Sequence, residues 1–456
     1  MRHIQEEDEE EKNKYEYPQH SEGEQISTPI TRLPELFLFL STALLASAIW
    51  NWVRVEYHGM PDVSESLSRF TKEMMLGDVD NELKIYLFDR EQKPTKDTCS
   101  NDDSLLTSEI IDAYRRDGVV AMRNVVSQDV LETLVAAGDK LVRTNNDRRM
   151  RGNTQFHSVK VGAIFMEGEV GEAFRNVALE GYVPKIAAEL NQIETEEHEC
   201  VDDENRSDDV FNLRLLRDIF LAKDNGEYVC GWHVDDYGFW PADTEYSGVN
   251  AWITLDDVSV DMGGGFAVSP GSHNADWNED AFQATGATPT FPKEGFKNVS
   301  DFFENRVGEG TCNLKRSAPH INEILEANKR IYDLKTGDIM FMTRWLWHRT
   351  IPFHTSLMKS NLIFKRYSIR YSQGKATVPM GYGTELSVLW DSANAGKSLN
   401  DVHGGPWYPQ VFPNTLKQEQ KSLLELSRKY MKDAQLILRE RRKEMKPYLA
   451  KLGQKI

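Results

Sequence analysis

Cysteine is scarce in this chain, with only 4 among 456 residues. They lie far apart, at Cys99, Cys200, Cys230 and Cys312, so no Cys-x-x-Cys pair exists to hold zinc or to act as a redox dithiol. The sequence leaves two alternatives open, two disulfides in an oxidising compartment or four buried thiols. A cysteine-based zinc or redox motif is therefore excluded, whereas structural disulfides are not.

Basic charge is also in short supply. Asp and Glu outnumber Lys and Arg by 72 to 54, which gives a formal net charge of −18 at pH 7. Binding of nucleic acid depends on Lys and Arg side chains that neutralise phosphates, so this balance argues against a nucleic acid partner. The hydrophobic fraction of 40% and the charged fraction of 28% are ordinary for a globular protein.

A single long apolar run stands out, the uncharged stretch 36–53 between Arg32 and Arg54. Its length reaches the lower limit for crossing a bilayer, so we predict a membrane anchor within 33–54 and a single-pass protein of the secretory pathway. Two alternatives compete: a signal peptide cleaved after Ala46-Ser47-Ala48, and a buried helix of a soluble protein. Flanking basic residues are balanced, so the orientation stays open.

Composition divides the chain into five segments. An acidic tail predicted to be disordered (1–32) precedes the apolar segment (33–54), a polar stem (55–105), a globular domain (106–400) and a basic helical extension (401–456). The extension is interpreted as an amphipathic helix packed on the domain, with contact to anionic lipid as the alternative. Within the domain, 274–334 is too long for a turn and predicts a lid or an elaborated loop with a helix near 321–329.

The globular domain begins with helical and short strand patterns and continues with many strands. A helix over 110–117 should end at Asp117-Gly118, a strand should cover 119–122, and Ser127 should begin a second helix. Strand-like runs follow at 212–222, 228–235, 248–255, 265–268, 338–342 and 362–371. This pattern predicts a mainly β fold with flanking helices, a sandwich or a barrel.

One short motif carries the chemistry, His233-Val234-Asp235. Among the 11 histidines only His233 has an Asp two residues later. In a strand, residues i and i+2 share a face, so this imidazole and this carboxylate can reach one point, as in the two-histidine, one-carboxylate site of non-haem Fe(II). We predict His348 as the third ligand, because an apolar strand after Gly337-Asp338 leads to it.

The remaining histidines are weaker candidates for the metal. His354 follows Pro352 and is the alternative third ligand. His273 and His403 lie in turn-like sequences and are interpreted as loop residues, with His403 able to lie near the mouth of the site.

An Fe(II) site of this kind takes 2-oxoglutarate as the usual electron donor, and the far carboxylate of that molecule needs a buried cation. The strand predicted at 362–371 offers Arg366, with Ser368 and Arg370 on the same face. We predict that Arg366 and Ser368 bind the carboxylate, with Arg370 as the alternative anchor. The competing interpretation is an edge strand with solvated charges.

Five blocks in order resemble the phytanoyl-CoA dioxygenase family. They are Tyr114–Val120, Trp232-His-Val-Asp235, Ala251–Val258, Gly263-Gly-Gly-Phe with Pro270-Gly-Ser-His273, and Gly337-Asp to His348, within about residues 106–375. The resemblance implies a double-stranded β-helix (jelly-roll, cupin-like) core, Fe(II), 2-oxoglutarate and O₂, with ascorbate as an accessory reductant. It matches His233, Asp235 and His348 to the iron ligands, Arg366 to the 2-oxoglutarate anchor, and Trp252 and Lys223 to residues near the cosubstrate. Both the interval from His233 to His348 and that from His348 to Arg366 are longer than the family pattern.

The resulting hypothesis is a dioxygenase that hydroxylates an unactivated C–H bond of a small, lipid-like molecule. Asp235 argues against a halogenase, because halide would occupy the position that this carboxylate fills. Desaturation or epimerisation at the same iron, and a silent membrane-tethered binding module, remain as alternatives. Aromatic residues near the ligands could wall an apolar pocket or be ordinary core, and the sequence does not choose between the two; they are Tyr237, Phe239, Trp240, Trp345 and Trp347.

Overall fold

The fold is described from a computed structural model. The structure describes residues 84–90, 104–144, 155–156, 163–166, 168–195, 211–223, 230–235, 240, 242–262, 266–290, 299–305, 313–351, 364–378, 396–401 and 408–413, with isolated positions at 425, 443 and 446–447. These residues belong to one compact unit, Asp80–Ile456. The predicted acidic tail, the apolar segment 36–53 and nearly all of the C-terminal extension lie outside them. No helix among the described residues is long and apolar enough to span a bilayer.

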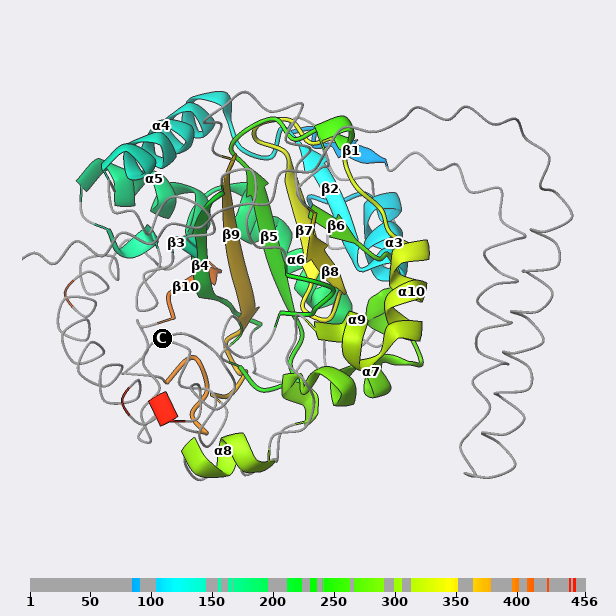
Figure 1. The fold of residues 1–456 in the computed structure, drawn as a ribbon. Coiled ribbons are helices and arrows are strands. Elements are labelled where there is room, and N and C mark those ends of the chain that lie inside the picture. Colours follow the sequence, from blue (N-terminus) through cyan, green and yellow to red (C-terminus); the bar gives the residue numbers. More distant parts are fainter. Residues whose placement is uncertain are drawn as a thin grey trace, which may run out of the picture. The chain divides into compact units, whose positions relative to one another are not determined.

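A large mixed sheet forms the centre of this unit (Figure 1), in the order β1-β2-β7-β5-β9-β4-β10, with β3 paired to β4. The strands are β1 Ile85–Leu87, β2 Val119–Arg123, β3 Gln155–Phe156, β4 Leu213–Lys223, β5 Gly248–Thr254, β7 Ile339–Thr343, β9 Phe364–Gln373 and β10 Gln410–Phe412. A second sheet pairs β6 (Phe266–Val268) with β8 (His348–Thr350). The strands predicted from the sequence are present in their described parts except at 228–235, of which the structure describes 230–235, and this part has only a one-residue bridge at His233.

Four helices precede or interrupt the first strands: α3 Ser108–Asp117, α4 Gln128–Thr144, α5 Gly168–Ala178 and α6 Tyr182–Thr195. The hydroxyl of Thr107 caps the first turn of α3 by accepting from the N–H of Ile110, and the helix ends at Gly118 with φ 70°. Gly118 therefore terminates the helix as predicted, because this left-handed conformation favours glycine. Gly337, with φ 91°, likewise allows the turn before β7.

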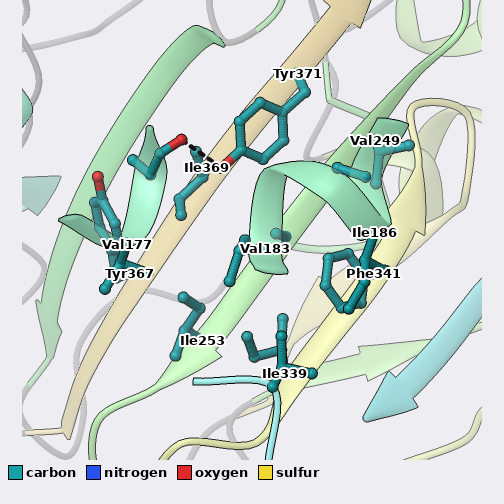
Figure 2. Packing of buried hydrophobic residues seen from close by; sticks show 14 of the residues in the cluster. Val177, Val183, Ile186, Val249, Ile253, Ile339, Phe341, Tyr367, Ile369 and Tyr371 are labelled. Atoms are coloured by element: carbon teal, nitrogen blue, oxygen red, sulfur yellow. Dashed lines mark hydrogen bonds between the residues drawn. The ribbon is translucent and has the colours of Figure 1, made fainter. Parts of the chain in front are cut away.

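The large sheet buries one face against these helices. Alternate residues of β5, β7 and β9, among them Ile253, Phe341 and Ile369, pack on Val183 and Ile186 of α6 (Figure 2). The hydroxyl of Tyr371, on the same face of β9, donates a hydrogen bond to the carbonyl of Ala178 at 2.8 Å. This face is the main apolar core, so it fixes which residues of β9 point to the opposite side.

The opposite face of the large sheet meets β6. Trp252, Met340 and Met342 from the large sheet pack with Val268 and Phe266. β9 lies between β5 and β4, and Arg366 and Arg370 are each only 5% exposed. The interpretation of this segment as an edge strand with solvated charges is therefore wrong.

The segment 274–334 is largely helical in its described part, with α7 Asn278–Thr285, α8 Val299–Asn305, α9 Leu314–Ser317 and α10 Pro319–Ala327. Residues of α7, α9 and α10 bury a core together with Trp232, Val234, Ala267 and Trp347. These helices thus cover the outer side of the small sheet. The helix predicted near 321–329 is present as α10, while the choice between a lid and an elaborated loop stays open.

Candidate metal centre

The segments of His233 and His348 are held side by side by a pair of backbone hydrogen bonds. Each N–H donates to the carbonyl of the other residue at 2.9 Å. The neighbours Trp232, Val234 and Trp347 turn into the core formed with α7, α9 and α10. Because side chains alternate along extended backbone, His233, Asp235 and His348 turn the other way, towards the large sheet.

Three possible metal-ligand atoms meet at this point. His233, Asp235 and His348 each offer one ligand atom, and these atoms lie within 4.8 Å of one another. The Nε2 of His348 is 3.7 Å from Oδ1 of Asp235. The structure therefore brings together the three residues that the sequence singled out, including the histidine more than a hundred positions away.

Backbone carbonyls orient both imidazole rings. Nδ1 of His233 lies 2.8 Å from the carbonyl of Gly231, and Nδ1 of His348 lies 2.9 Å from that of Leu346. A carbonyl only accepts, so each Nδ1 carries the proton and each Nε2 keeps its lone pair for a metal.

Asp235 is held by two buried side chains of the large sheet. Its Oδ2 accepts from Nε of Arg370 at 2.8 Å and from Nδ2 of Asn250 at 3.2 Å. Asn250 accepts in turn from the hydroxyl of Ser368 at 2.8 Å. These bonds occupy Oδ2 and leave Oδ1 on the side of His348.

Electrostatics keep the three groups in the forms that bind a cation. Burial, and after it the nearby His348, lower the pKa of His233 to about 3. Burial lowers the pKa of His348 as well. Burial would raise the pKa of Asp235, but the charge and hydrogen bond of Arg370 and the two histidines together outweigh burial, and the pKa falls to about 2. At neutral pH the site therefore holds two neutral imidazoles and one carboxylate.

The predicted cosubstrate residues have different surroundings. Arg366 lies on the site face of β9 with its guanidinium carbon 5.4 Å from the ring centroid of Trp252, and burial lowers its pKa to about 10. Arg370, the alternative anchor, is instead the partner of Asp235. Ser368 donates to Asn250 and so joins the support of Asp235. Lys223 ends β4 opposite Phe364, and its side chain lies outside the described residues.

Of the two interpretations left open for the aromatic residues, ordinary core holds for the three tryptophans. Trp345 and Trp347 pack in the core under α7, α9 and α10, and Trp240 packs in a separate cluster. Tyr237 and Phe239 lie outside the described residues. The aromatic ring beside the ligands is Phe266, stacked on Trp252 at 4.7 Å and 5.3 Å from the ring of His348.

Two further observations concern the other histidines and the cysteines. His273 packs against Gly118 at the end of α3, away from the ligand set, while His354 and His403 lie outside the described residues. Cys230, the one cysteine among the described residues, is disulfide-bonded.

Sequence reasoning missed Asn250 and Phe266. Asn250 lies in a strand read as apolar, and a lone polar residue on the face of a buried strand was the available signal. Phe266 ends the block Gly263-Gly-Gly-Phe that resembles the family, and its place in this block was the available signal.

The donor set fits Fe(II). Two histidine nitrogens and one carboxylate oxygen on one side of an ion are the ligands of non-haem iron that activates oxygen. A desolvated arginine on the same side of the sheet fits the carboxylate of an organic acid such as 2-oxoglutarate.

The chain matches the model of the phytanoyl-CoA dioxygenase (PhyH) family over residues 114–360, more than half of its length. A site of this kind defines an iron- and 2-oxoglutarate-dependent oxygenase. The chain belongs to the phytanoyl-CoA dioxygenase family, and it is a 2-oxoglutarate-dependent dioxygenase with iron, 2-oxoglutarate and O₂ as its cofactor and cosubstrates.

Solved structures give more distant similarities. The α-ketoglutarate-dependent carbocyclase SnoK of nogalamycin biosynthesis is 19% identical, with a TM-score of 0.41 over 61% of this chain and 88% of its own. EctD from S. alaskensis, solved with 2-oxoglutarate and 5-hydroxyectoine, is 13% identical, with a TM-score of 0.42 over 65% and 86%. Identity and TM-score are both low, so the assignment rests on the family model. No curated protein matches the chain.

Proposed function

We propose that this oxygenase hydroxylates an unactivated C–H bond of a small, apolar molecule. The observation that carries the proposal is the complete ligand set: Asp235, tied to Arg370 at 2.8 Å, lies beside Nε2 of His348. A carboxylate in this position leaves no place on the protein side for a halide, which favours hydroxylation over halogenation.

In this proposal each residue has a defined task. Nε2 of His233, Nε2 of His348 and Oδ1 of Asp235 would hold Fe(II), and Arg366 would bind the far carboxylate of 2-oxoglutarate. With O₂, the bound iron and 2-oxoglutarate supply the oxidising chemistry, and 2-oxoglutarate leaves as succinate and CO₂. The stacked rings of Trp252 and Phe266 would exclude water beside His348.

The apolar character of the substrate is supported by this aromatic pair and by the uncharged run 36–53. A chain anchored through that run would meet lipid-like molecules at a membrane surface. The proposal also includes a double-stranded β-helix core, for which the two facing sheets are the support. Asn205 and Asn298 lie in Asn-x-Ser sequences, so their glycosylation in cells would place the domain in the lumen.

The test is anaerobic binding of Fe(II) and 2-oxoglutarate, followed by measurement of succinate after O₂ is admitted. We expect binding of both, succinate release that rises with a hydroxylated substrate, and loss of succinate in His233→Ala. Absence of 2-oxoglutarate turnover with any pool of apolar metabolites would contradict the proposal and favour a silent binding module. Mass analysis of the product separates hydroxylation, which adds one oxygen, from desaturation or epimerisation at the same centre.

A further inference from the structure

The long segment between β6 and β7 packs on the ligand-bearing backbone, on the side opposite the candidate metal ligands. Its helix α10 packs through Ile321 and Leu325 into the core that also contains Trp232 and Trp347. Those two tryptophans immediately precede His233 and His348 in the sequence. The outer face of the ligand-bearing backbone is therefore covered by α10 and its neighbours.

One carboxylate of α10 makes polar contacts with both ligand-bearing segments. Oε1 of Glu326 accepts from Nε1 of Trp232 at 2.9 Å and from the guanidinium of Arg349. Oε2 faces Nζ of Lys329 at 3.1 Å. Burial opposes its charge, but the hydrogen bonds from Lys329 and Trp232 outweigh burial and lower the pKa of Glu326, so the carboxylate is charged at neutral pH.

The two partners of Glu326 flank the candidate metal ligands. Trp232 directly precedes His233, and Arg349 directly follows His348. The guanidinium carbon of Arg349 lies 5.8 Å from the centroid of the Trp232 ring, so the two side chains also contact each other across the bridge. Three backbone hydrogen bonds join the two segments, two between His233 and His348 and one from the N–H of Thr350 to the carbonyl of Cys230.

We propose that Glu326 is a positioning residue for the metal centre, which fixes the spacing of His233 and His348 by binding Trp232 and Arg349 from the opposite side. The pairing of β8 with β6 and the backbone hydrogen bonds hold the two segments on one side, and a charged acceptor shared by both segments adds a contact that resists their separation. The segment 274–334 then stabilises the geometry of the site through this residue. This inference rests on the proposed function, because it takes these histidines as metal ligands.

The test measures Co(II) binding by the full-length protein and does not depend on turnover. Glu326→Ala removes both contacts, and we expect a Kd for Co(II) roughly tenfold higher or more, the effect typical of groups that orient metal ligands. The visible absorption of bound Co(II) should also change, because it reports ligand geometry. Glu326→Gln keeps an acceptor for Trp232 and should fall between Glu326→Ala and the wild type, which serves if the alanine variant folds poorly.

Matched controls separate positioning from stability. Glu323→Ala removes the same side chain from an exposed position of the same helix, and Leu325→Val weakens the packing of α10 without touching its polar contacts. Neither should change the Co(II) spectrum. Combining Glu326→Ala with Arg349→Met should cost less affinity than the sum of the single changes, because both remove one contact.

The outcomes distinguish the two proposals. An unchanged Kd and spectrum in both Glu326 variants, with Co(II) bound by the wild type, would overturn the inference and leave the proposed function standing. A Kd that rises equally in Leu325→Val would overturn it as well, since stability alone would then explain the effect. Failure of the wild type to bind Co(II) would contradict the proposed function itself.

Discussion

Nε of Arg370 donates to Oδ2 of Asp235 at 2.8 Å, and both side chains are only 6% exposed. An ion pair removed from water in this way orients a carboxylate strongly, since neither partner has solvent as an alternative. Asn250 makes the second contact to the same oxygen. The carboxylate of Asp235 is therefore oriented before a metal binds, and Oδ1 is the atom left to act as a ligand.

Loss of this pair should weaken metal binding and the fold together. In Arg370→Gln the charge that compensates buried Asp235 is gone, and breaking a buried ion pair costs about 3–5 kcal/mol. We also expect Co(II) affinity to fall by roughly 10–100-fold, as for other groups that orient a ligand. Urea unfolding and metal titration measure the two effects. Arg214→Gln is the control: Arg214 is equally buried but donates to the carbonyl of Tyr408, so only stability should fall.

Substitution of Arg366 should weaken binding of 2-oxoglutarate and leave binding of the metal unchanged. Arg366→Gln removes the desolvated cation beside Trp252, and loss of a charged hydrogen bond of about 1.5–3 kcal/mol should raise the Kd for 2-oxoglutarate roughly 10–150-fold. Co(II) binding in the absence of 2-oxoglutarate should be unchanged, because the ligand carboxylate of Asp235 is held by Arg370 and Asn250. A variant that binds 2-oxoglutarate as the wild type does would identify another anchor.

Metal uptake should be nearly independent of pH between about 5 and 8. The pKa of His233 is lowered to about 3 and that of Asp235 to about 2, so neither holds a proton that the metal must displace in this range. A solvent-exposed histidine site would lose affinity below its ordinary pKa of about 6.5. Calorimetry of Co(II) binding in buffers of different ionisation enthalpy should therefore show close to zero protons released, and release of a full proton would contradict the prediction.

The same pKa values predict acid sensitivity of the metal-free fold. In the unfolded protein His233 binds a proton below about pH 6.5, whereas in the folded protein it does not bind one until about pH 3. The free energy of unfolding therefore decreases as the pH is lowered from about 6.5 to about 3. The slope is about 1.4 kcal/mol per pH unit for each such group. Asp218 opposes it, because burial raises its pKa to about 6 and its folded form gains stability as the pH falls below that value.

Urea unfolding at several pH values measures this slope. The difference between the wild type and His233→Gln isolates the histidine from Asp218 and other groups. We expect the variant to lose less stability between pH 7 and pH 5, and equal slopes would contradict the assignment of a neutral buried imidazole.

The sequence predicted the ligands because the signal was local or followed a strong strand. His233 and Asp235 are two residues apart, and His348 follows an apolar strand and a turn that needs glycine at 337. The described part of the strand predicted at 228–235, residues 230–235, forms only a one-residue bridge at His233. This bridge is enough to place the side chains of His233 and Asp235 on one side. Family resemblance supplied 2-oxoglutarate as the cosubstrate, and the role of Arg366 as its anchor stays a prediction.

The support of the ligands was not predictable, because it depends on strand order. Arg370 meets Asp235 only because β9 pairs with β5, where Asn250 is directly opposite Arg370. Nothing in the sequence tells which strands are neighbours, so the contacts of Arg370 and Ser368 with Asp235 and Asn250 could not be predicted. Glu326 was hidden for the same reason, since its partners lie 94 and 23 positions away.

One face of β9 packs in the apolar core and the other faces the metal centre. The number of residues in this strand is therefore strictly constrained. Tyr367, Ile369 and Tyr371 enter the apolar core, while the residues between them face the metal centre. Deletion of one residue before Arg366 would exchange the faces, placing arginines in the core and tyrosines at the metal. We therefore expect relatives of this chain to vary by substitution along β9 and to confine their insertions and deletions to the loops at its ends.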